Sequence, residues 1–394
     1  MSTARLPAEW RYLLAGAAGT AITMGVGRFA YTPLLPLMQH DHGLDAVAGS
    51  WLAASHFGGY LAGALLAALW LPARRRAAAF IGGLVASVLS SAGMGLSETF
   101  TSWMLLRFVS GLGAAAAMVL GGALVLERLP ATQRAFGSGL LYGGMALGIV
   151  GSTLAINGLA AGGWHAPAIW LACAAACTPL LWCARPLLEA PPSSVAEART
   201  ALEARPLHLG WLLLAYACAG YGYSTSATFL PLIVRGLGVG PQISAWVWLL
   251  VGLAALPASF AWGWIAARCG SRRALDFAYL VQAAGVGLPL LLPNATGALL
   301  SGALFGASFI AVVALALAIA REAEPTRASR VIGLMTSAYG LTQILGPLVS
   351  ARLIGPHDNF SWPLVLASAS LLLGFALLRL AYRRPPLRLL TESA

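Results

Sequence analysis

The chain has 394 residues, of which 59% are hydrophobic and only 9% charged, and its mean hydropathy is +0.79. Soluble domains carry about 25% charged residues, so this composition excludes an ordinary soluble protein and predicts a chain that lies in a lipid bilayer. The net charge of +11 alone would suggest a nucleic-acid partner, but the positions of the basic residues exclude it.

Long apolar stretches occupy most of the sequence. A transmembrane helix needs about 20 mainly apolar residues, and twelve such stretches occur, joined by short connections. We therefore predict an all-α membrane protein of twelve transmembrane helices, without room for a soluble catalytic domain. The predicted spans are residues 11–38, 46–71, 77–96, 101–126, 134–162, 166–186, 208–234, 242–267, 273–293, 297–320, 329–354 and 362–381.

All 24 basic residues are arginines, and they are distributed unevenly. Most fall in loops or helix ends on one side of the predicted membrane. Only Arg235 and Arg352 fall on the other side, and Arg28 and Arg107 fall inside spans. Cytoplasmic loops carry an excess of positive charge. The arrangement therefore predicts cytoplasmic termini and a lipid bilayer, rather than nucleic acid, as the partner of this charge.

The polar segment at residues 187–207 separates six spans from six. We predict an N-terminal six-helix bundle at residues 1–186, a cytoplasmic linker at 187–207 and a C-terminal six-helix bundle at 208–394. The two halves also align at one constant offset. Two parallel repeats imply a substrate cavity near the bilayer midplane and rocking of one half against the other. The matched positions include Gly25 with Gly220, Trp51 with Trp246, Gly111 with Gly306 and Glu127 with Glu322.

Several motifs resemble those of the major facilitator superfamily. GWIAARCGSRRAL at residues 263–275 resembles the signature G-x-L-A-D-R-x-G-R-R-x-x-L, departing from it at Ala267 and Ser271. Arg107, Gly111 and Gly113 resemble the pattern R-x3-G-x-G in the fourth helix. GVGRFAYTPLLPLM at 25–38 and SHFGGYL at 55–61 resemble the bacterial YbfB/YjiJ branch. This resemblance implies the twelve-helix fold, a bacterial inner-membrane location and transport, but it supplies no cargo.

Two arginines inside predicted spans are the main candidates for cargo binding. A charged side chain deep in a membrane helix costs about 2.5–3.5 kcal/mol on insertion scales, and neither span holds an acidic residue to pair with Arg28 or Arg107. A guanidinium matches a carboxylate bidentately, which favours an anionic cargo. The alternative is that each guanidinium binds backbone carbonyls, for which Pro33 and Pro36 would free acceptors near Arg28.

Polar residues in other spans complete the predicted site. Tyr31 lies in the first span beside Arg28, and Tyr223 is the repeat counterpart of Arg28. Tyr339 and Gln343 share one face of the eleventh span, being four residues apart. We expect these four side chains to bind the polar parts of a cargo. The alternative for such residues is hydrogen bonding between helices.

His56 is the only histidine well inside a predicted span. Because histidine titrates near neutral pH, His56 is a candidate proton carrier, with simple packing as the alternative.

Charged residues near the cytoplasmic ends of the spans suggest a gate between helix ends. Exposed ion pairs are worth only about 0–1 kcal/mol, yet a difference of that order is enough to bias two states. Surface charge without function is the alternative. The candidates are Glu127, Arg134, Arg268, Arg272, Glu322 and Arg330.

The leading function is secondary transport of a small organic solute, an organic anion by the argument above, through alternating access. ATP is not the expected driver because the phosphate-binding loop G-x4-G-K-[ST] is absent from the sequence. We expect no cofactor, no metal site and a monomer; Cys173 and Cys177 share a helix face but have no His or carboxylate beside them.

Two alternatives stay open at this point. A proton-coupled multidrug exporter usually needs a carboxylate deep inside the membrane, and all acidic residues fall in loops or at helix ends; the one nearest to the interior of a predicted span is Asp276. An integral membrane enzyme would need clustered catalytic groups. The outer loops offer one tight group, His40, Asp41 and His42, which we interpret as a solvated turn.

Overall fold

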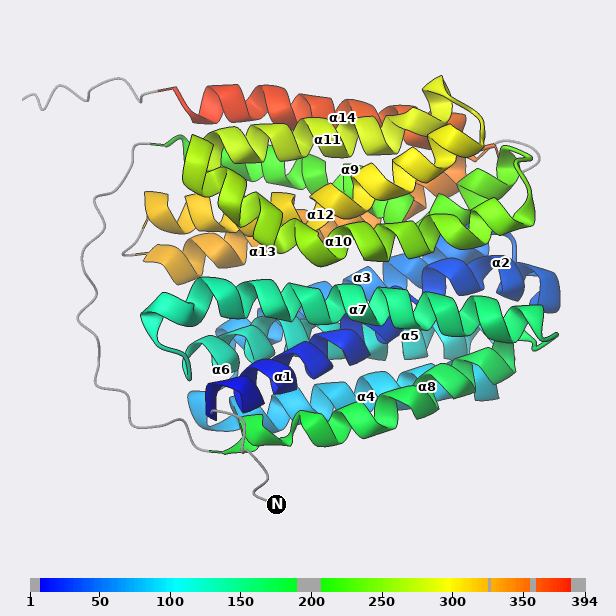
Figure 1. Cartoon of the computed structure of the whole chain (residues 1–394), viewed down its shortest axis with the longest axis horizontal. Helices are drawn as coiled ribbons and strands as arrows, with labels where there is room; N and C mark the ends of the chain where they lie inside the picture. The colour runs from blue at the N-terminus through cyan, green and yellow to red at the C-terminus, as the bar shows by residue number, and fades with distance from the viewer. Residues whose placement is uncertain (1–7, 190–206, 325–326, 355–358, 384–394) are drawn as a thin grey trace, which may run out of the picture.

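The computed structural model describes residues 8–189, 207–324, 327–354 and 359–383, and these residues form twelve long helical segments (Figure 1). The predicted all-α fold of transmembrane helices is confirmed. Most of the predicted linker at 187–207 lies outside the described residues.

The first six segments contain two interrupted helices. In the first segment, α1 continues into the π-helix η1 and then into α2; in the fourth, α5 continues through η3 into α6. The bounds are α1 Ala8–Thr20, η1 Ala21–Arg28, α2 Tyr31–His42, α3 Ala46–Leu69, α4 Arg76–Leu96, α5 Phe100–Ala115, η3 Ala116–Gly121, α6 Gly122–Leu126, α7 Arg134–Ala161 and α8 Ala166–Cys183.

The last six segments are continuous helices, and three short 3₁₀ turns follow helices of the first half. The bounds are α9 Leu209–Gly236, α10 Pro241–Cys269, α11 Ser271–Leu291, α12 Ala295–Ala323, α13 Ala328–Leu353 and α14 Ser361–Ala381. The 3₁₀ turns are η2 Ala73–Arg75, η4 Ala131–Gln133 and η5 Arg185–Leu188.

Eleven segments of the described chain are long and apolar enough to cross a membrane. The twelfth, α9, has 28 residues but is not among the eleven. It carries a run of hydroxyl groups at Ser224, Thr225, Ser226 and Thr228, all buried, and these lower its hydropathy. The polar helix is therefore enclosed by its neighbours instead of facing lipid.

Helix ends follow local sequence signals. Asp45 caps α3 by accepting from the Ala48 N–H at 2.6 Å, and Asn294 caps α12 by accepting from the Gly297 N–H at 2.9 Å. Gly270, the glycine of the superfamily signature, separates α10 from α11 at a φ of 86°. A side chain is strained at such an angle, so the sharp turn between these helices requires glycine there.

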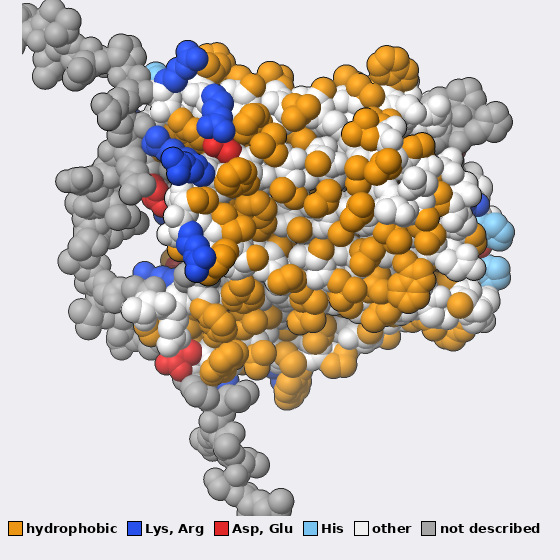
Figure 2. Space-filling view, turned by 45° about the horizontal axis from the view of Figure 1, so that its top comes forward, with side chains coloured by type: hydrophobic (Ala, Val, Ile, Leu, Met, Phe, Trp, Pro, Cys, Tyr) orange, Lys and Arg blue, Asp and Glu red, His pale blue; other side chains and the backbone are white. Residues whose placement is uncertain are grey.

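The molecule is arranged as two groups of helices, with α1–α8 on one side and α9–α14 on the other (Figure 1). Across the boundary, α3 packs against α13 and α7 packs against α10. Arginines gather at one end of the molecule, whereas apolar side chains cover the flank between the two ends (Figure 2). We call this the arginine-rich end; the helix ends that lie there carry Arg74, Arg75, Arg76, Arg134, Arg268, Arg272 and Arg321.

The internal repeat is visible in the packing of individual residues. A methyl group added at Gly111 would collide with the carbonyl oxygen of His56, and one added at Gly306 would collide with that of Val251. Gly306 follows Gly111, and Val251 follows His56, by the constant offset that relates the two repeats. Thr32 and Ala227, which are 195 residues apart, share the offset and form a direct hydrogen bond. Equivalent helices of the two halves therefore pack in equivalent ways.

The close approach of neighbouring helices at Gly111 and Gly306 predicts how substitutions there change the stability of the fold. Gly111→Ala and Gly306→Ala should each lower the melting temperature, because the new methyl group meets a backbone carbonyl of the neighbouring helix; overpacking typically costs about 1–3 kcal/mol. Gly151→Ala is the matched control, since open space surrounds that position on α7. The measurement is thermal unfolding in detergent. Equal melting temperatures for all three variants would contradict the close-packing argument.

Candidate functional site

A cavity of about 520 Å³ lies between the two halves. Its walls come from both halves and reach the arginine-rich end at Ala68, Leu126, Arg321 and Ile332. Within the described residues the lining holds two arginines, Arg28 and Arg321, and no aspartate or glutamate. The electrostatic potential of such a cavity is positive, which favours an anionic ligand.

Arg28 owes its position to an irregular stretch of the first segment. In η1 the Phe29 N–H donates to the Met24 carbonyl at 3.0 Å, the wider spacing of a π-helix. Pro33 has no N–H, so the Phe29 carbonyl loses its usual helical donor and accepts from the Thr32 N–H at 3.3 Å instead. Such local widening is frequent at functional sites. Here it ends at Arg28, which lines the cavity.

The Arg28 guanidinium is buried without an acidic partner. The residue is 6% exposed, and its Nε and Nη2 atoms have no hydrogen-bond partner among the described residues. Four aromatic rings surround it, with centroids 4.8 Å (Phe57), 5.2 Å (Phe29), 5.3 Å (Tyr223) and 5.8 Å (Tyr60) from the central carbon. Cation–π contacts offset part of the cost of burying the charge, but they leave Nε and Nη2 without a hydrogen-bond acceptor among the described residues.

Arg107 binds a backbone carbonyl, which is the alternative that the sequence left open for it. Its Nη1 donates to the Gly27 carbonyl at 2.7 Å, and its central carbon lies 4.4 Å from the Tyr31 ring centroid. Ser110 donates to the same carbonyl at 3.0 Å. The Tyr31 hydroxyl donates to the Gly49 carbonyl at 2.8 Å. Neither Arg107 nor Tyr31 lines the cavity in this conformation. Both instead hold the irregular first segment against α3 and α5, which is the backbone-binding alternative.

The other three predicted binding residues do line the cavity. Tyr223 extends from α9, and Tyr339 and Gln343 lie one turn apart on α13. The Gln343 Oε1 atom has no hydrogen-bond partner among the described residues. The structure thus brings together Arg28, Tyr223, Tyr339 and Gln343, from both halves of the chain.

Five further lining residues escaped the sequence analysis as binding candidates. Tyr60, Tyr142, Tyr216, Phe309 and Arg321 all face the cavity. Tyr60 belongs to the SHFGGYL motif, so that motif could have indicated it. Arg321 was counted among loop arginines, because we ended the tenth span one residue before it. The structure continues α12 to Ala323, which places Arg321 on the wall near the cavity mouth.

His56 is fully buried and lies outside the cavity lining. Its ring approaches the backbone of Arg107 without completing a hydrogen bond, and both ring nitrogens lack partners among the described residues. An edge-on contact with Phe57, 6.2 Å between centroids, links it to a ring beside Arg28. Its role as a proton carrier stays a prediction.

The contacts described for the predicted gating residues each lie within one half of the molecule. Glu127 pairs with Arg76 at 3.3 Å, but both belong to the first half. Arg134 donates from Nε to the Leu126 carbonyl at 3.3 Å. In the second half, Arg268 lies over Trp264 and Arg272 over Tyr382. Glu322 forms no ion pair among the described residues, and Arg330 is exposed. The cavity is open at the end where these residues lie.

Direct contacts between the halves close the opposite end of the cavity. Thr32 donates from Oγ1 to the Ala227 carbonyl at 2.6 Å, and Asn157 donates to the Ala245 carbonyl at 3.0 Å. Phe29 meets Trp248 with centroids 5.9 Å apart. Among the described residues, the lining of the cavity therefore leads to Arg28 from the arginine-rich end.

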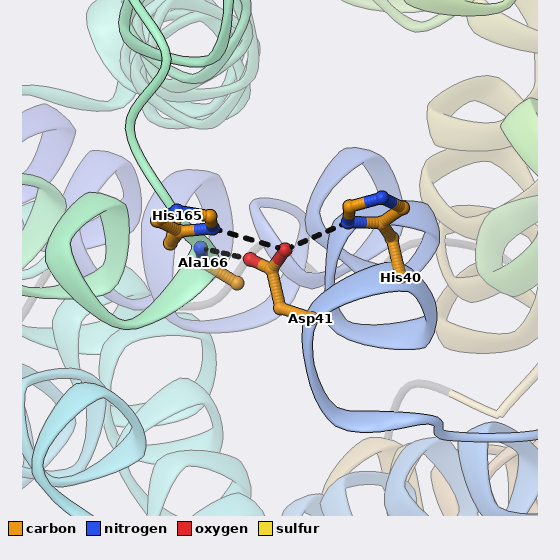
Figure 3. Close-up of polar contacts among 4 residues, drawn as sticks. All are labelled: His40, Asp41, His165 and Ala166. Atoms are coloured by element: carbon orange, nitrogen blue, oxygen red, sulfur yellow. Dashed lines mark hydrogen bonds and ion pairs between the residues drawn. The ribbon is translucent and has the colours of Figure 1, made fainter.

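His40 and Asp41, which we interpreted as part of a solvated turn, lie in the last turn of α2, and Asp41 links this helix to the start of α8. The Asp41 carboxylate accepts from His40 Nδ1 at 2.9 Å, His165 Nδ1 at 3.2 Å and the Ala166 N–H at 2.7 Å (Figure 3). The expectation failed because α2 continues to His42, past the predicted end at residue 38. Asp41 thereby reaches the first N–H of α8 and satisfies a donor that helix geometry leaves free.

Comparisons with known proteins agree with this architecture. The family model described as "Uncharacterised MFS-type transporter YbfB" matches residues 20–379. The inner membrane transport protein YdhP of Escherichia coli O157:H7 is 24% identical over 380 residues, covering 95% of this chain and 96% of that protein. The same protein from Escherichia coli strain K12 is 23% identical over the same shares.

Solved structures show the same fold. A bacterial homolog of the human lysosomal transporter Spinster, in an inward-facing and occupied conformation, has a TM-score of 0.68 and 13% identity, with 97% of this chain and 98% of that chain covered. A mutant of the nucleoside transporter NupG has a TM-score of 0.65 and 12% identity, with 95% and 99% covered. The chain is thus a membrane transporter and not an enzyme, and it belongs to the YbfB-type family of the major facilitator superfamily.

Proposed function

We propose that the protein is a secondary active transporter of a small organic anion, which it moves by alternating access between its two six-helix halves. The observation that carries the proposal is the unpaired Arg28 guanidinium at the closed end of a cavity whose described lining holds no acidic residue. Burying an uncompensated charge is costly. A carboxylate that enters the cavity supplies both the missing charge and the missing hydrogen-bond acceptors.

The second arginine adds to the attraction at longer range. Arg321 lines the cavity near its mouth and is exposed, whereas Arg28 is buried at the far end. An anion approaching from the arginine-rich end therefore encounters the exposed Arg321 first and the buried, desolvated Arg28 afterwards. Exposed charges mainly increase the rate of encounter, whereas buried hydrogen-bonded charges determine how slowly the ligand leaves.

Membrane orientation is part of the proposal. With the arginine-rich end in the cytoplasm, as the positive-inside bias predicts, the described conformation opens toward the cytoplasm. Reporter fusions after residue 200 should then be active only as cytoplasmic reporters, and fusions after Gly163 only as periplasmic ones. A periplasmic signal after residue 200 would overturn the proposed orientation.

The experiment that tests the anion proposal compares each acid with its neutral amide. Purified protein is heated with hexanoate or benzoate, and with hexanamide or benzamide. A ligand stabilises the folded state by RT ln(1 + [L]/Kd), about 2.7 kcal/mol at a hundredfold excess over Kd. We expect stabilisation by at least one of the acids and none by its amide. The lipophilic cation tetraphenylphosphonium represents the multidrug alternative, and preferential binding of this cation would reject the anion proposal.

Substitution of Arg28 should then remove the preference for the acid. Arg28→Gln loses the charge-assisted hydrogen bonds, worth roughly 1.5–3 kcal/mol, so affinity should fall by about ten- to more than a hundredfold. Arg28→Lys keeps the charge without the planar fork and should lie between Gln and wild type. Arg235→Gln, at the exposed end of α9, is the matched control and should bind normally. A folded Arg28→Gln protein with wild-type affinity would reject the site.

Arg321→Gln should act mainly on the rate of binding. Because this arginine is exposed, its attraction is screened by salt. We expect slower association and a weaker dependence of the association rate on ionic strength, with a smaller loss of affinity than for Arg28→Gln. Stopped-flow binding at several salt concentrations measures both quantities. An unchanged salt dependence would show that Arg321 does not attract the ligand.

A further inference from the structure

Beyond Arg28, the closed end of the cavity is built from aromatic rings. Tyr216 stacks on Tyr339 with centroids 4.5 Å apart, Tyr339 lies 6.2 Å from Tyr223, and Tyr223 stacks on Phe309 at 5.7 Å. Phe309 meets Phe29 edge-on at 5.9 Å. All five rings line the cavity. We call this series, drawn from α9, α12, α13 and the end of η1, the aromatic wall.

The aromatic wall is held firmly by its surroundings. Its rings are between 1% and 8% exposed, so each is packed on most sides and shows only a small area to the cavity. Rings fixed in this way lose little conformational entropy when a ligand binds against them. The wall is therefore preorganised for a flat apolar group and is not a flexible surface that adapts to many shapes.

The wall and the cation are in direct contact. The central carbon of Arg28 is 5.3 Å from the Tyr223 centroid and 5.2 Å from the Phe29 centroid. A carboxylate bound to the free Nε and Nη2 atoms of Arg28 places the adjoining part of the ligand against these rings. On α13, Gln343 offers an unpaired Oε1 atom one turn from Tyr339. A polar substituent at a distance from the carboxylate can bind there.

We infer that the cavity binds aromatic carboxylates, with the carboxylate on Arg28 and the ring against Tyr223 and the rest of the aromatic wall. This inference rests on the proposed anion transport and names the class of anion. A volume of about 520 Å³ lies within the range of roughly 300–1,000 Å³ that is usual for sites of drug-sized ligands, so one or two rings fit. Aromatic pairs prefer offset or edge-on contact, both of which occur in the wall.

The test uses two acids that differ only in the ring. Benzoate and cyclohexanecarboxylate have the same charge and nearly the same size, but only benzoate is planar and aromatic. Affinity is measured by calorimetry on the purified full-length protein, with benzamide as the neutral comparison. We expect benzoate to bind about tenfold more tightly than cyclohexanecarboxylate. 4-Hydroxybenzoate, whose hydroxyl can reach Gln343, should bind more tightly still.

Variants of the wall separate ring contact from folding. Tyr223→Leu should bind benzoate and cyclohexanecarboxylate with about equal affinity. Its affinity for cyclohexanecarboxylate should stay within about threefold of wild type. Tyr223→Phe keeps the ring and should keep the preference. Tyr339→Leu provides a second, independent wall variant, so the test does not depend on the folding of Tyr223→Leu. Tyr12→Leu, which removes a tyrosine near Arg128 outside the cavity, is the control and should change nothing.

The outcomes distinguish this inference from the anion proposal. If both acids bind equally and both depend on Arg28, the aromatic inference is wrong and the anion proposal stands. If benzamide binds as tightly as benzoate, the anion proposal is wrong, and the inference of an aromatic carboxylate is then wrong as well. If neither acid binds, the aromatic inference is wrong, and if hexanoate also fails to stabilise the protein, the anion proposal is wrong as well. A benzoate preference that disappears in Tyr223→Leu and persists in Tyr223→Phe supports both.

Discussion

The geometry of the candidate site depends on the hydrogen bonds that the backbone carbonyl of Gly27 accepts. It accepts hydrogen bonds from Arg107 at 2.7 Å and from Ser110 at 3.0 Å, which fill its two lone pairs. Irregular backbone is tolerated at membrane depth only where protein groups or water satisfy it. The widened turn that ends at Arg28 is thus anchored by α5, and the next residue along the chain faces the cavity. Arg107 and Arg28 therefore differ in their environments, since Arg107 binds the backbone whereas Nε and Nη2 of Arg28 have no hydrogen-bond partner among the described residues.

Pseudo-symmetry explains why Arg28 faces an aromatic ring. Arg28 and Tyr223 occupy equivalent positions of the two repeats, and so do Thr32 and Ala227. Both pairs are in contact, at 5.3 Å from guanidinium carbon to ring centroid and at 2.6 Å between hydrogen-bonded oxygens. Equivalent positions can touch only near the axis that relates the two halves. The divergence of the sequences at this axis, arginine in one half and tyrosine in the other, creates a cation beside an aromatic surface.

Much of the fold could be predicted from composition and periodicity, because a bilayer requires long apolar helices and leaves few alternatives. Arg28 and Tyr223 could be predicted as candidates, since an arginine without an acidic partner in an apolar span requires an explanation, and both line the cavity. For Arg107 the sequence left cargo binding and carbonyl binding both open, because a sequence does not show which carbonyl a guanidinium reaches. Arg321 was missed since a charged residue was taken to end its span. Tyr216 and Phe309 could not be separated from ordinary core aromatics, because both kinds share the same apolar pattern.

The contacts that close the cavity lie close to the proposed binding residue along the same helical segment. Thr32, which bonds the second half, is four residues beyond Arg28, and Phe29 contacts both the guanidinium and Trp248. The closing hydrogen bonds are neutral, and each such bond contributes only about 0.5–1.5 kcal/mol net. A ligand moves a conformational equilibrium by its difference in affinity for the two states, and each 1.4 kcal/mol of that difference is a factor of ten. In the proposed function, a cargo on Arg28 contacts the same short stretch that holds the halves together. A modest difference in affinity between the two states is then sufficient for the proposed coupling of cargo binding to the opening of the other end.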